Sequence, residues 1–356
     1  MLVREGRVVG QGAHRYDQRD HAEIVALKDA AACGEDTQGT TAFVTLEPCS
    51  IHGRTGPCAD ALIAAGVIRV VAATVDPNPL VSGRGFQKMR DAGIEVVVRD
   101  PSSEIAIQAR RCIDAFAFSV QYGRPFVTLK SAASAEGYLA PRGHQGQFRL
   151  TGESARAEVQ RLRHASDALL TGIGTVLADD PSLTDRTQLP RRRGLMRCVL
   201  DASLRLPLHA AMLRDHPEDV VVFGAENASA EVAFATRRAA LEARGVRIVK
   251  LPSHDGALDL VAALRWLQEQ QVRSVLLEAG SQGNGSMLAA QLVDRMVLFK
   301  SPTSTGPNGV PFSADATTPA DWIARLSSVQ RRTFPRVDGN EDLCISGYLH
   351  DPWASL

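Results

Sequence analysis

The sequence predicts an α/β protein of two domains, and three observations support this prediction. The chain has 356 residues, which is more than one hydrophobic core usually serves. Stretches typical of strands alternate with stretches typical of helices along the chain. The run Tyr122-Gly123-Arg124-Pro125 breaks this alternation with turn-forming residues, as domain boundaries do. We therefore expect one domain at residues 1–120 and another at residues 124–356.

The first domain opens with a predicted hairpin at residues 2–12, whose turn is Glu5-Gly6. No helix precedes this hairpin, so we expect the domain to be short at its N-terminal side, with one sheet face left uncovered. Alternating patterns then predict helix 22–32, strand 42–46, helix 58–65, strand 67–74, helix 85–91, strand 94–98 and helix 104–120.

The second domain repeats the alternation with shorter and more apolar strands. Its predicted strands are 126–130, 168–171, 198–200, 220–223, 246–249 and 274–277, and its predicted helices are 153–164, 229–243 and 257–269. A glycine-rich turn at residues 278–286 is expected to open a further helix at 287–292.

Four residues near the N-terminus have the types and order of a zinc deaminase site. They are His21, Glu23, Cys49 and Cys58, with Pro48 directly before the first cysteine. Two thiolates and one imidazole leave the fourth zinc position open for water, whose pKa the ion lowers to about 7. His21 and Glu23 can serve one site only at the first turn of a helix, because residues two apart diverge by about 200°. We expect the glutamate to carry protons rather than bind metal.

The alternative is that His21 and Glu23 are surface residues and that both cysteines are small buried hydrophobic residues. That interpretation is the usual one for a single histidine or cysteine. It is rare for all four residues in this order. The spacing of the cysteines departs from the common Cys-x-x-Cys, since eight residues separate Cys49 from Cys58.

The composition narrows the class of partner. Formal net charge is zero and aromatic residues make up 5%, which argues against a dedicated nucleic-acid binder. The six cysteines form no disulfide framework and are consistent with a reducing cytoplasm. The sequence shows neither a secretory leader nor a run of 18 apolar residues, so we expect a cytoplasmic enzyme with a small-molecule substrate and no membrane contact.

Three further stretches allow two interpretations each. The amides of the 278–286 turn can cradle a phosphate, or the turn is only a connection. Residues 171–181 offer glycines, hydroxyls and two carboxylates for ligand binding, or form a link with Asp179 as a local cap. The segment 76–85 is a simple connection, or brings Asn78 and Arg84 to a substrate. We interpret the run Arg191-Arg192-Arg193 as a solvated loop, or at most as a weak attractor for phosphate.

With these residues laid out, the chain resembles the bifunctional deaminase/reductase family of riboflavin biosynthesis over nearly its whole length. The matching motifs are Glu47-Pro48-Cys49, Gly53-Arg54-Thr55, Pro57-Cys58, Asp60-Ala61-Leu62, Asp76-Pro77-Asn78-Pro79, Gly83-Arg84-Gly85, Thr175 to Pro181 with Leu183-Thr184, and Glu278-Ala279-Gly280. The long loop between the two cysteines distinguishes this family from cytidine and tRNA deaminases.

The resemblance implies a cytidine-deaminase-like three-layer domain followed by a dihydrofolate-reductase-like α/β domain, in a homo-oligomer. The first domain would deaminate a diaminopyrimidine ribotide at zinc held by His21, Cys49 and Cys58, with Glu23 relaying the proton. The second would reduce the ribosyl group of the product with NADPH. The positions that align with NADPH contacts are Ala132, Thr175, Asp179, Gly280, Ser281, Gln282, Gly283, Asn284, Gly285 and Ser286. Those that align with substrate contacts are Arg163, Leu183, Arg186 and Glu278.

The second domain departs from the family pattern in three places, one motif and two single positions. The family's Ser-Leu-Asp-Gly reads Ser134-Ala135-Glu136-Gly137 here, and Gln147 and Arg149 stand where a substrate-binding Ser and a cofactor-stacking Trp are expected. The alternative function is therefore a deaminase whose reductase-like domain is weakened or inactive. A nucleoside or RNA deaminase, and a zinc module without activity, are further alternatives.

Overall fold

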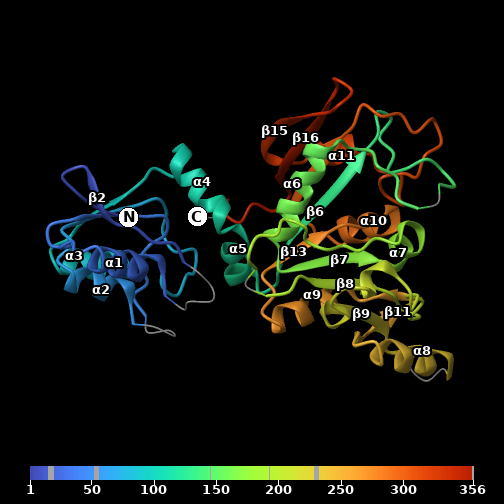
Figure 1. Ribbon diagram of the computed structural model, residues 1–356, viewed down its shortest axis with the longest axis horizontal. Helices are drawn as coiled ribbons and strands as arrows, with labels where there is room; N and C mark the ends of the chain where they lie inside the picture. Colours follow the sequence, from blue (N-terminus) through green and yellow to red (C-terminus); the bar gives the residue numbers. More distant parts are fainter. Residues whose placement is uncertain (15–19, 52–55, 145, 192, 228–231, 355–356) are drawn as a thin grey trace. The chain divides into compact units, whose positions relative to one another are not determined.

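The computed structural model describes residues 1–14, 20–51, 56–144, 146–191, 193–227 and 232–354 (Figure 1). Its contacts divide the chain into two compact units. The first is Met1–Tyr122 together with the C-terminal segment that starts at Pro352, and the second is Gly123–Asp351. The C-terminal segment is held in the first unit by Trp353, whose indole N–H donates to Asp114 over 2.8 Å.

The first unit is built on a five-stranded sheet with the order β2-β1-β3-β4-β5. The predicted hairpin is confirmed, since β1 and β2 pair in antiparallel fashion, and β3, β4 and β5 are parallel to one another. The strands are β1 (Leu2–Arg4), β2 (Arg7–Gly10), β3 (Thr41–Val44), β4 (Arg69–Ala72) and β5 (Glu95–Val98). Parallel strands joined by helices are what the sequence alternation predicted.

Helices α1 (Ala22–Ala32), α2 (Cys58–Ala64) and α3 (Arg84–Asp91) pack with this sheet around one apolar core. Ala42, Val70 and Ala72 face that core, whereas Phe43, which points the other way from β3, is 42% exposed. The single helix predicted at 104–120 is wrong. The chain breaks at Ile113 into α4 (Glu104–Cys112) and α5 (Asp114–Tyr122), because Ile113 leaves the helical region of backbone conformation.

The second unit contains a nine-stranded sheet with the order β10-β9-β8-β7-β13-β6-β14-β16-β15. Neighbouring strands in this order are parallel from β10 through β9, β8, β7, β13 and β6 to β14. Strand β16 pairs in antiparallel fashion with β14 and β15. Their bounds are β6 (Phe126–Ala133), β7 (Ala168–Gly172), β8 (Met196–Leu200), β9 (Val220–Ala225), β10 (Arg247–Leu251), β13 (Ser274–Leu277), β14 (Arg295–Lys300), β15 (Ser327–Pro335) and β16 (Glu341–Tyr348). The last three strands carry no sequence-based prediction.

Helices connect these strands, together with short elements in the loops. They are α6 (Glu153–His164), α7 (Ile173–Asp179), α8 (Val232–Glu242), α9 (Leu260–Glu269), α10 (Ser281–Ala289) and α11 (Pro319–Ile323). Two short 3₁₀ turns, η2 (Ala211–Leu213) and η3 (Pro217–Asp219), and the small hairpin of β11 (Ser253–His254) and β12 (Ala257–Leu258) complete the unit. The start of the helix predicted at 229–243 lies outside the described residues.

Three sequence-based boundaries in this unit are corrected by the structure. Residues 173–179 are helical rather than a turn, residues 257–258 belong to the small hairpin rather than to α9, and α10 begins at Ser281 instead of at residue 287. Packing explains the glycine-rich α10. A Cβ on Gly285 would lie 2.8 Å from the Ser313 hydroxyl, so the helix approaches its neighbour more closely than an alanine would allow.

No helix within the described residues combines the length and the apolar character that crossing a membrane requires.

Candidate active sites

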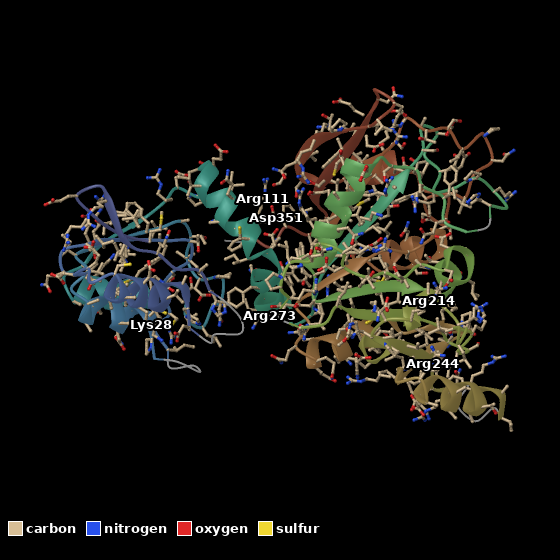
Figure 2. All side chains as sticks on the ribbon, viewed as in Figure 1. Lys28, Arg111, Arg214, Arg244, Arg273 and Asp351 are labelled. Carbon is tan, nitrogen blue, oxygen red and sulfur yellow. The ribbon has the colours of Figure 1, made fainter. Side chains whose placement is uncertain are left out.

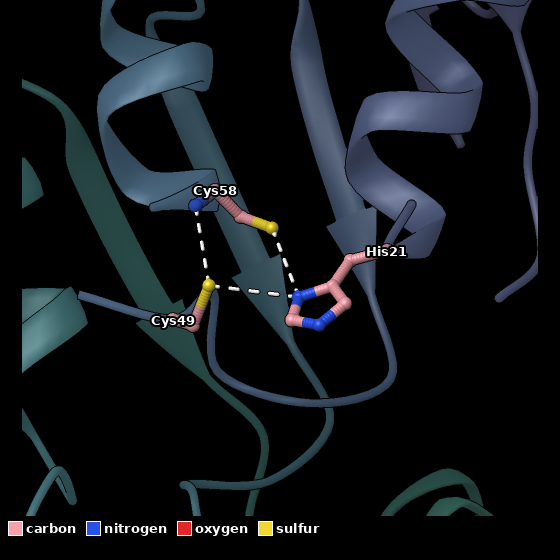
Figure 3. A group of neighbouring side chains, drawn as sticks. All are labelled: His21, Cys49 and Cys58. Carbon is pink, nitrogen blue, oxygen red and sulfur yellow. Dashed lines mark hydrogen bonds between the residues drawn. The ribbon is translucent and has the colours of Figure 1, made fainter. Parts of the chain in front are cut away.

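The first candidate site gathers three metal-ligating side chains in the N-terminal unit (Figure 3). The Nδ1 atom of His21 lies 3.5 Å from the Cys49 sulfur and 3.3 Å from the Cys58 sulfur. All three ligand atoms lie within 4.8 Å of one another. One imidazole nitrogen and two thiolates at this separation fit the tetrahedral coordination of zinc.

Local structure places each of these side chains. His21 is the residue immediately before α1, so both it and Glu23 lie at the first turn, as the sequence required. Cys58 is the first residue of α2, directly after Pro57. Its backbone N–H donates to the Cys49 sulfur over 3.2 Å. A helix N-terminus and a donated N–H both favour a thiolate.

The protonation of the cluster follows from the proximity of its groups. A hydrogen bond from the Cys58 thiol lowers the pKa of Cys49 to about 4, and the same contact, with burial, raises the pKa of Cys58. Burial raises the pKa of Glu23, whose carboxyl group also contacts the Cys58 thiol. A carboxyl group with a raised pKa exchanges protons closer to neutral pH.

One residue near this cluster, His14, was not predicted from the sequence. The ring of His14 packs edge-on against that of His21, with centroids 5.4 Å apart. Its Nδ1 atom lies 2.8 Å from the backbone oxygen of Asp20. The signal was a second histidine seven residues before His21, which carries no metal-ligand spacing on its own. The motif residues 53–55, between the two cysteines, lie outside the described residues.

The second candidate site is a cavity of about 980 Å³ in the second unit. It lies where β7 and β13 end, at the edge of a parallel sheet where ligands usually bind. Most positions that align with cofactor and substrate contacts line it, namely Ala132, Arg163, Thr175, Asp179, Leu183, Arg186, Glu278, Gly280, Ser281, Gln282, Gly283 and Ser286. The volume is large enough for a dinucleotide and a small substrate together.

The cofactor run is divided by α10. Gly280 through Gly283 line the cavity at the helix N-terminus, where free amides and the helix dipole favour a diphosphate. The backbone N–H of Gly280 donates to the Thr175 hydroxyl over 3.0 Å. Asn284 is fully buried, and its side-chain amide donates to the backbone oxygen of Phe312. Asn284 and Gly285 therefore face the core rather than the cavity.

A buried carboxylate lies in the wall of the cavity. Glu278 receives two hydrogen bonds from Arg163, at 2.6 and 3.0 Å, and lies 3.5 Å from the Lys130 ammonium group. Burial by itself would raise the pKa of Glu278, but Lys130 and Arg163 lower it to about 2. The carboxylate is charged at all physiological pH values. Lys130 escaped the sequence reasoning because a lysine within a predicted strand carries no motif.

Arg186 differs from Arg163 in its partners. Among the described residues, its guanidinium bonds two neutral hydroxyl groups, those of Ser182 at 2.8 Å and Thr184 at 3.5 Å. It is exposed at the cavity, whereas Arg163 is largely buried and is already paired. Within the described part of the chain no carboxylate pairs with Arg186, so its guanidinium is available to bind an anion.

The three departures from the family pattern have different surroundings. Glu136 accepts hydrogen bonds from the hydroxyls of Ser134 and Ser304 and from the backbone of Thr305. The hydrogen bond from Ser304, followed by those from Thr305 and Ser134, lowers the pKa of Glu136 to about 2. The loop after β14 thus accommodates the longer side chain. Gln147 and Arg149 are exposed and line the cavity.

Charged groups of both signs are interspersed over the two units (Figure 2). The labelled Lys28 in the first unit, and Arg214 and Arg244 in the second, are exposed cations. This distribution agrees with the zero net charge and with a small-molecule substrate.

Two family models match the chain, one for each unit. Residues 1–74 match the cytidine and deoxycytidylate deaminase zinc-binding region, and residues 125–335 match the RibD C-terminal domain. The first match contains the histidine and both cysteines of the cluster. The second contains every residue named above in the cavity.

Curated relatives and solved structures match most of the chain. The riboflavin biosynthesis protein RibD of Escherichia coli is 39% identical over 318 residues, covering 86% of this chain and 81% of the relative. RibD of Aquifex aeolicus is 37% identical over 307 residues, covering 86% of this chain and 80% of the relative. The structure of Acinetobacter baumannii RibD is 33% identical with a TM-score of 0.76, covering 98% of this chain and 90% of that one.

A Thermotoga maritima structure described as a diaminohydroxyphosphoribosylaminopyrimidine deaminase/5-amino-6-(5-phosphoribosylamino)uracil reductase has a TM-score of 0.75 and 29% identity. It covers 98% of this chain and 90% of that one.

Proposed function

Because the chain belongs to the RibD family of riboflavin biosynthesis proteins, we propose that it carries out two successive steps on one pyrimidine ribotide, each at a separate site. It is a bifunctional enzyme, a zinc-dependent deaminase and an NADPH-dependent reductase. The observation that carries the proposal is the cluster of His21, Cys49 and Cys58, with Glu23 beside it, in a unit distinct from that of the reductase cavity. We assign the deaminase to residues 1–120 and the reductase to the sequence-based range 124–356, less the segment from Pro352, which belongs to the first unit.

In the deaminase, His21, Cys49 and Cys58 hold the zinc ion. Zinc, when bound, makes water nucleophilic near neutral pH. Glu23 takes the proton of the attacking water on a carboxyl oxygen and passes it to the amino group that leaves as ammonia. The substrate is the diaminohydroxyphosphoribosylaminopyrimidine named for the Thermotoga relative.

In the reductase, the N-terminus of α10 would hold the diphosphate of NADPH, and Thr175 and Asp179 on α7 line the same cavity. NADPH, when bound, supplies the hydride that reduces the ribosyl group. Ala132 and Ser286 complete the cofactor side, and Asn284 and Gly285 support the turn of α10 from the core. Arg186 holds the substrate phosphate, while Leu183 packs against the substrate and Arg163 orients Glu278 toward it.

We propose that the reductase half is active even though Glu136, Gln147 and Arg149 depart from the family pattern. Glu136 has a full set of partners, and the pair of Arg163 and Glu278 is intact. The alternative of a deaminase with an inactive second domain is not favoured by the two family matches. We also propose that the enzyme is a cytoplasmic homo-oligomer, as the resemblance implies.

A coupled assay tests the order of the two steps. Purified chain loaded with zinc is given the diaminopyrimidine ribotide, first without and then with NADPH, while ammonia and NADPH absorbance are followed. We expect ammonia in both cases, and NADPH oxidation only after ammonia is released. Ammonia release with no NADPH oxidation, even with the deaminated substrate supplied directly, would establish the deaminase alone.

A further inference from the structure

The residue two positions before the metal ligand Cys49 is a buried carboxylate. Glu47 follows β3 and is only 4% exposed. Its carboxylate accepts four backbone N–H groups, each from the segment that runs from residue 76 to the start of α3. A carboxylate that is buried with four amide donors is a fixed part of the architecture rather than a solvated charge.

The four donors come from both ends of one loop. Oε2 accepts from Asp76 at 3.1 Å and from Gly83 at 2.9 Å, and Oε1 accepts from Gly85 at 2.8 Å and from Phe86 at 3.2 Å. Gly85 and Phe86 belong to the first turn of α3, whose own capping position makes no side-chain hydrogen bond. Glu47 therefore caps α3 from another element and closes the loop at residues 76–86 at the same time.

Close packing at Gly85 makes this arrangement rigid. A Cβ on Gly85 would lie 2.0 Å from the backbone oxygen of Pro48, so a larger residue here would push the start of α3 away from Pro48. Pro48 is the residue between Glu47 and Cys49. The start of α3 is thus pressed against the same short segment that carries the metal ligand.

The loop closed in this way lies beside the metal cluster. The Asp76 carboxyl group is buried and close enough to Cys49 for their charges to interact. Within the loop, the Asp76 carboxylate accepts from the Asn78 N–H at 2.8 Å, and the Asn78 side chain accepts from the Leu80 N–H at 3.1 Å. These hydrogen bonds order the loop internally. Its position relative to the metal ligands depends on the hydrogen bonds to Glu47.

We infer that Glu47 is a positioning residue of the deaminase, which fixes the 76–86 loop against the metal-ligand segment so that the loop forms one wall of the pyrimidine site. This inference rests on the proposed deaminase function. Glu47 contacts neither the metal cluster nor the reacting atoms in this role. It acts through the four amides, so its loss should weaken substrate binding before it affects the metal or the chemical step.

The test compares Glu47→Gln with the parent chain, both loaded with zinc. Glutamine has the same shape, but its NH₂ group would face two N–H donors, so two of the four hydrogen bonds are lost. We expect zinc content and the reductase kinetics to match the parent. The deaminase KM should rise about 10-fold to 100-fold, as expected for losing charge-assisted hydrogen bonds, and kcat should change much less. Hydrogen exchange of the amides at residues 76 and 83–86 should accelerate.

Three companion variants make the test specific. Glu47→Asp keeps the charge but is too short to reach both ends of the loop, so its KM should be intermediate, and it replaces Glu47→Gln if the latter does not fold. Gly85→Ala breaks the same contact from the α3 side and should also raise KM with zinc retained. Combining Gly85→Ala with Glu47→Gln should raise KM by less than the product of the single effects. Glu95→Gln, which removes an exposed carboxylate from β5, should behave like the parent.

Two outcomes would overturn the inference. One is a parent-like KM together with parent-like amide exchange in Glu47→Gln, and the other is zinc loss in that variant, which would make Glu47 a support for the metal itself. A parent chain that releases no ammonia would instead overturn the proposed function, and amide exchange would still decide whether Glu47 holds the loop.

Discussion

The metal cluster and the reductase cavity differ in the length of chain that supplies their residues. The metal ligands and Glu23 all come from residues 21–58, at the starts of two helices and just beyond one strand. The cavity draws on positions from Ala132 to Ser286, brought together only when the nine-stranded sheet forms. The first site can therefore be recognised from spacing, while the second becomes visible only in the fold.

The two sites also differ in the sign of their uncompensated charge. The metal cluster brings together Glu23 and two sulfurs, and therefore needs a cation. The cavity is lined by arginines, of which Arg163 is paired with Glu278 while Arg186 is bonded to neutral groups among the described residues. It therefore needs an anion. Substitutions in one unit should leave the other activity intact, and the variants at Cys58 and Glu278 test this independence.

The largest effect is expected from removing a metal ligand. Cys58→Ser replaces a thiolate with a hydroxyl that is a poor zinc ligand at neutral pH. We expect zinc to be lost and ammonia release to fall at least about 1000-fold, to the background rate, since the metal supplies the nucleophile. Elemental analysis and an ammonia assay measure both quantities. Reductase activity should remain, and Cys33→Ser, at an exposed cysteine that follows the last residue of α1, is the matched control.

The second largest effect is expected at the proton-carrying group. Glu23→Gln keeps the size of the side chain but cannot relay a proton, so ammonia release should fall about 100-fold to 10,000-fold. Zinc content should equal that of the parent. Metal lost along with activity would contradict the assigned role, because Glu23 would then support the metal.

A stability effect is expected in the other unit. Glu278→Gln leaves Arg163 and Lys130 without their carboxylate, which should cost on the order of 3 kcal/mol of unfolding free energy, as when one partner of a buried ion pair is removed. Reductase activity should fall, while ammonia release should stay within about twofold of the parent.

The pH dependence of this effect follows from the lowered pKa of Glu278. Because that pKa is lower in the folded chain than in the unfolded one, its contribution is present above pH 4.5 and is lost as the pH falls toward about 2. Chemical denaturation at several pH values measures it. The stability difference between the parent and Glu278→Gln should narrow over that range, and a constant difference would show that Glu278 is not held ionised.

The smallest effect is expected at Glu136, the residue that differs from the family pattern and contacts the loop after β14. Glu136→Asp restores the residue that the family usually has, at an exposed position where Ser304 and Thr305 already satisfy the glutamate. The reductase KM values should change by no more than about twofold. A large gain in reductase activity would mean that Glu136 weakens the reductase of this chain.

Sequence patterns predicted local elements better than packing between them. The predicted bounds of α1, α6 and β13 agree with the structure. The start of α10 was wrong because glycines ordinarily weaken a helix, and only the close approach at Gly285 explains them. The contacts of Glu47 could not be predicted from the sequence. All four of its partners are backbone N–H groups, which nearly every residue type has.

The contact between the Thr175 hydroxyl and the Gly280 amide has a consequence for how the cofactor enters. The oxygen already receives one of the amides that α10 offers to a diphosphate, so the helix end is held in shape before any ligand arrives. If the diphosphate binds there as we propose, its anionic oxygens would replace this neutral acceptor without rebuilding the backbone. The attraction that drives this exchange is electrostatic, so the affinity for the dinucleotide should weaken as ionic strength increases, while its orientation stays the same.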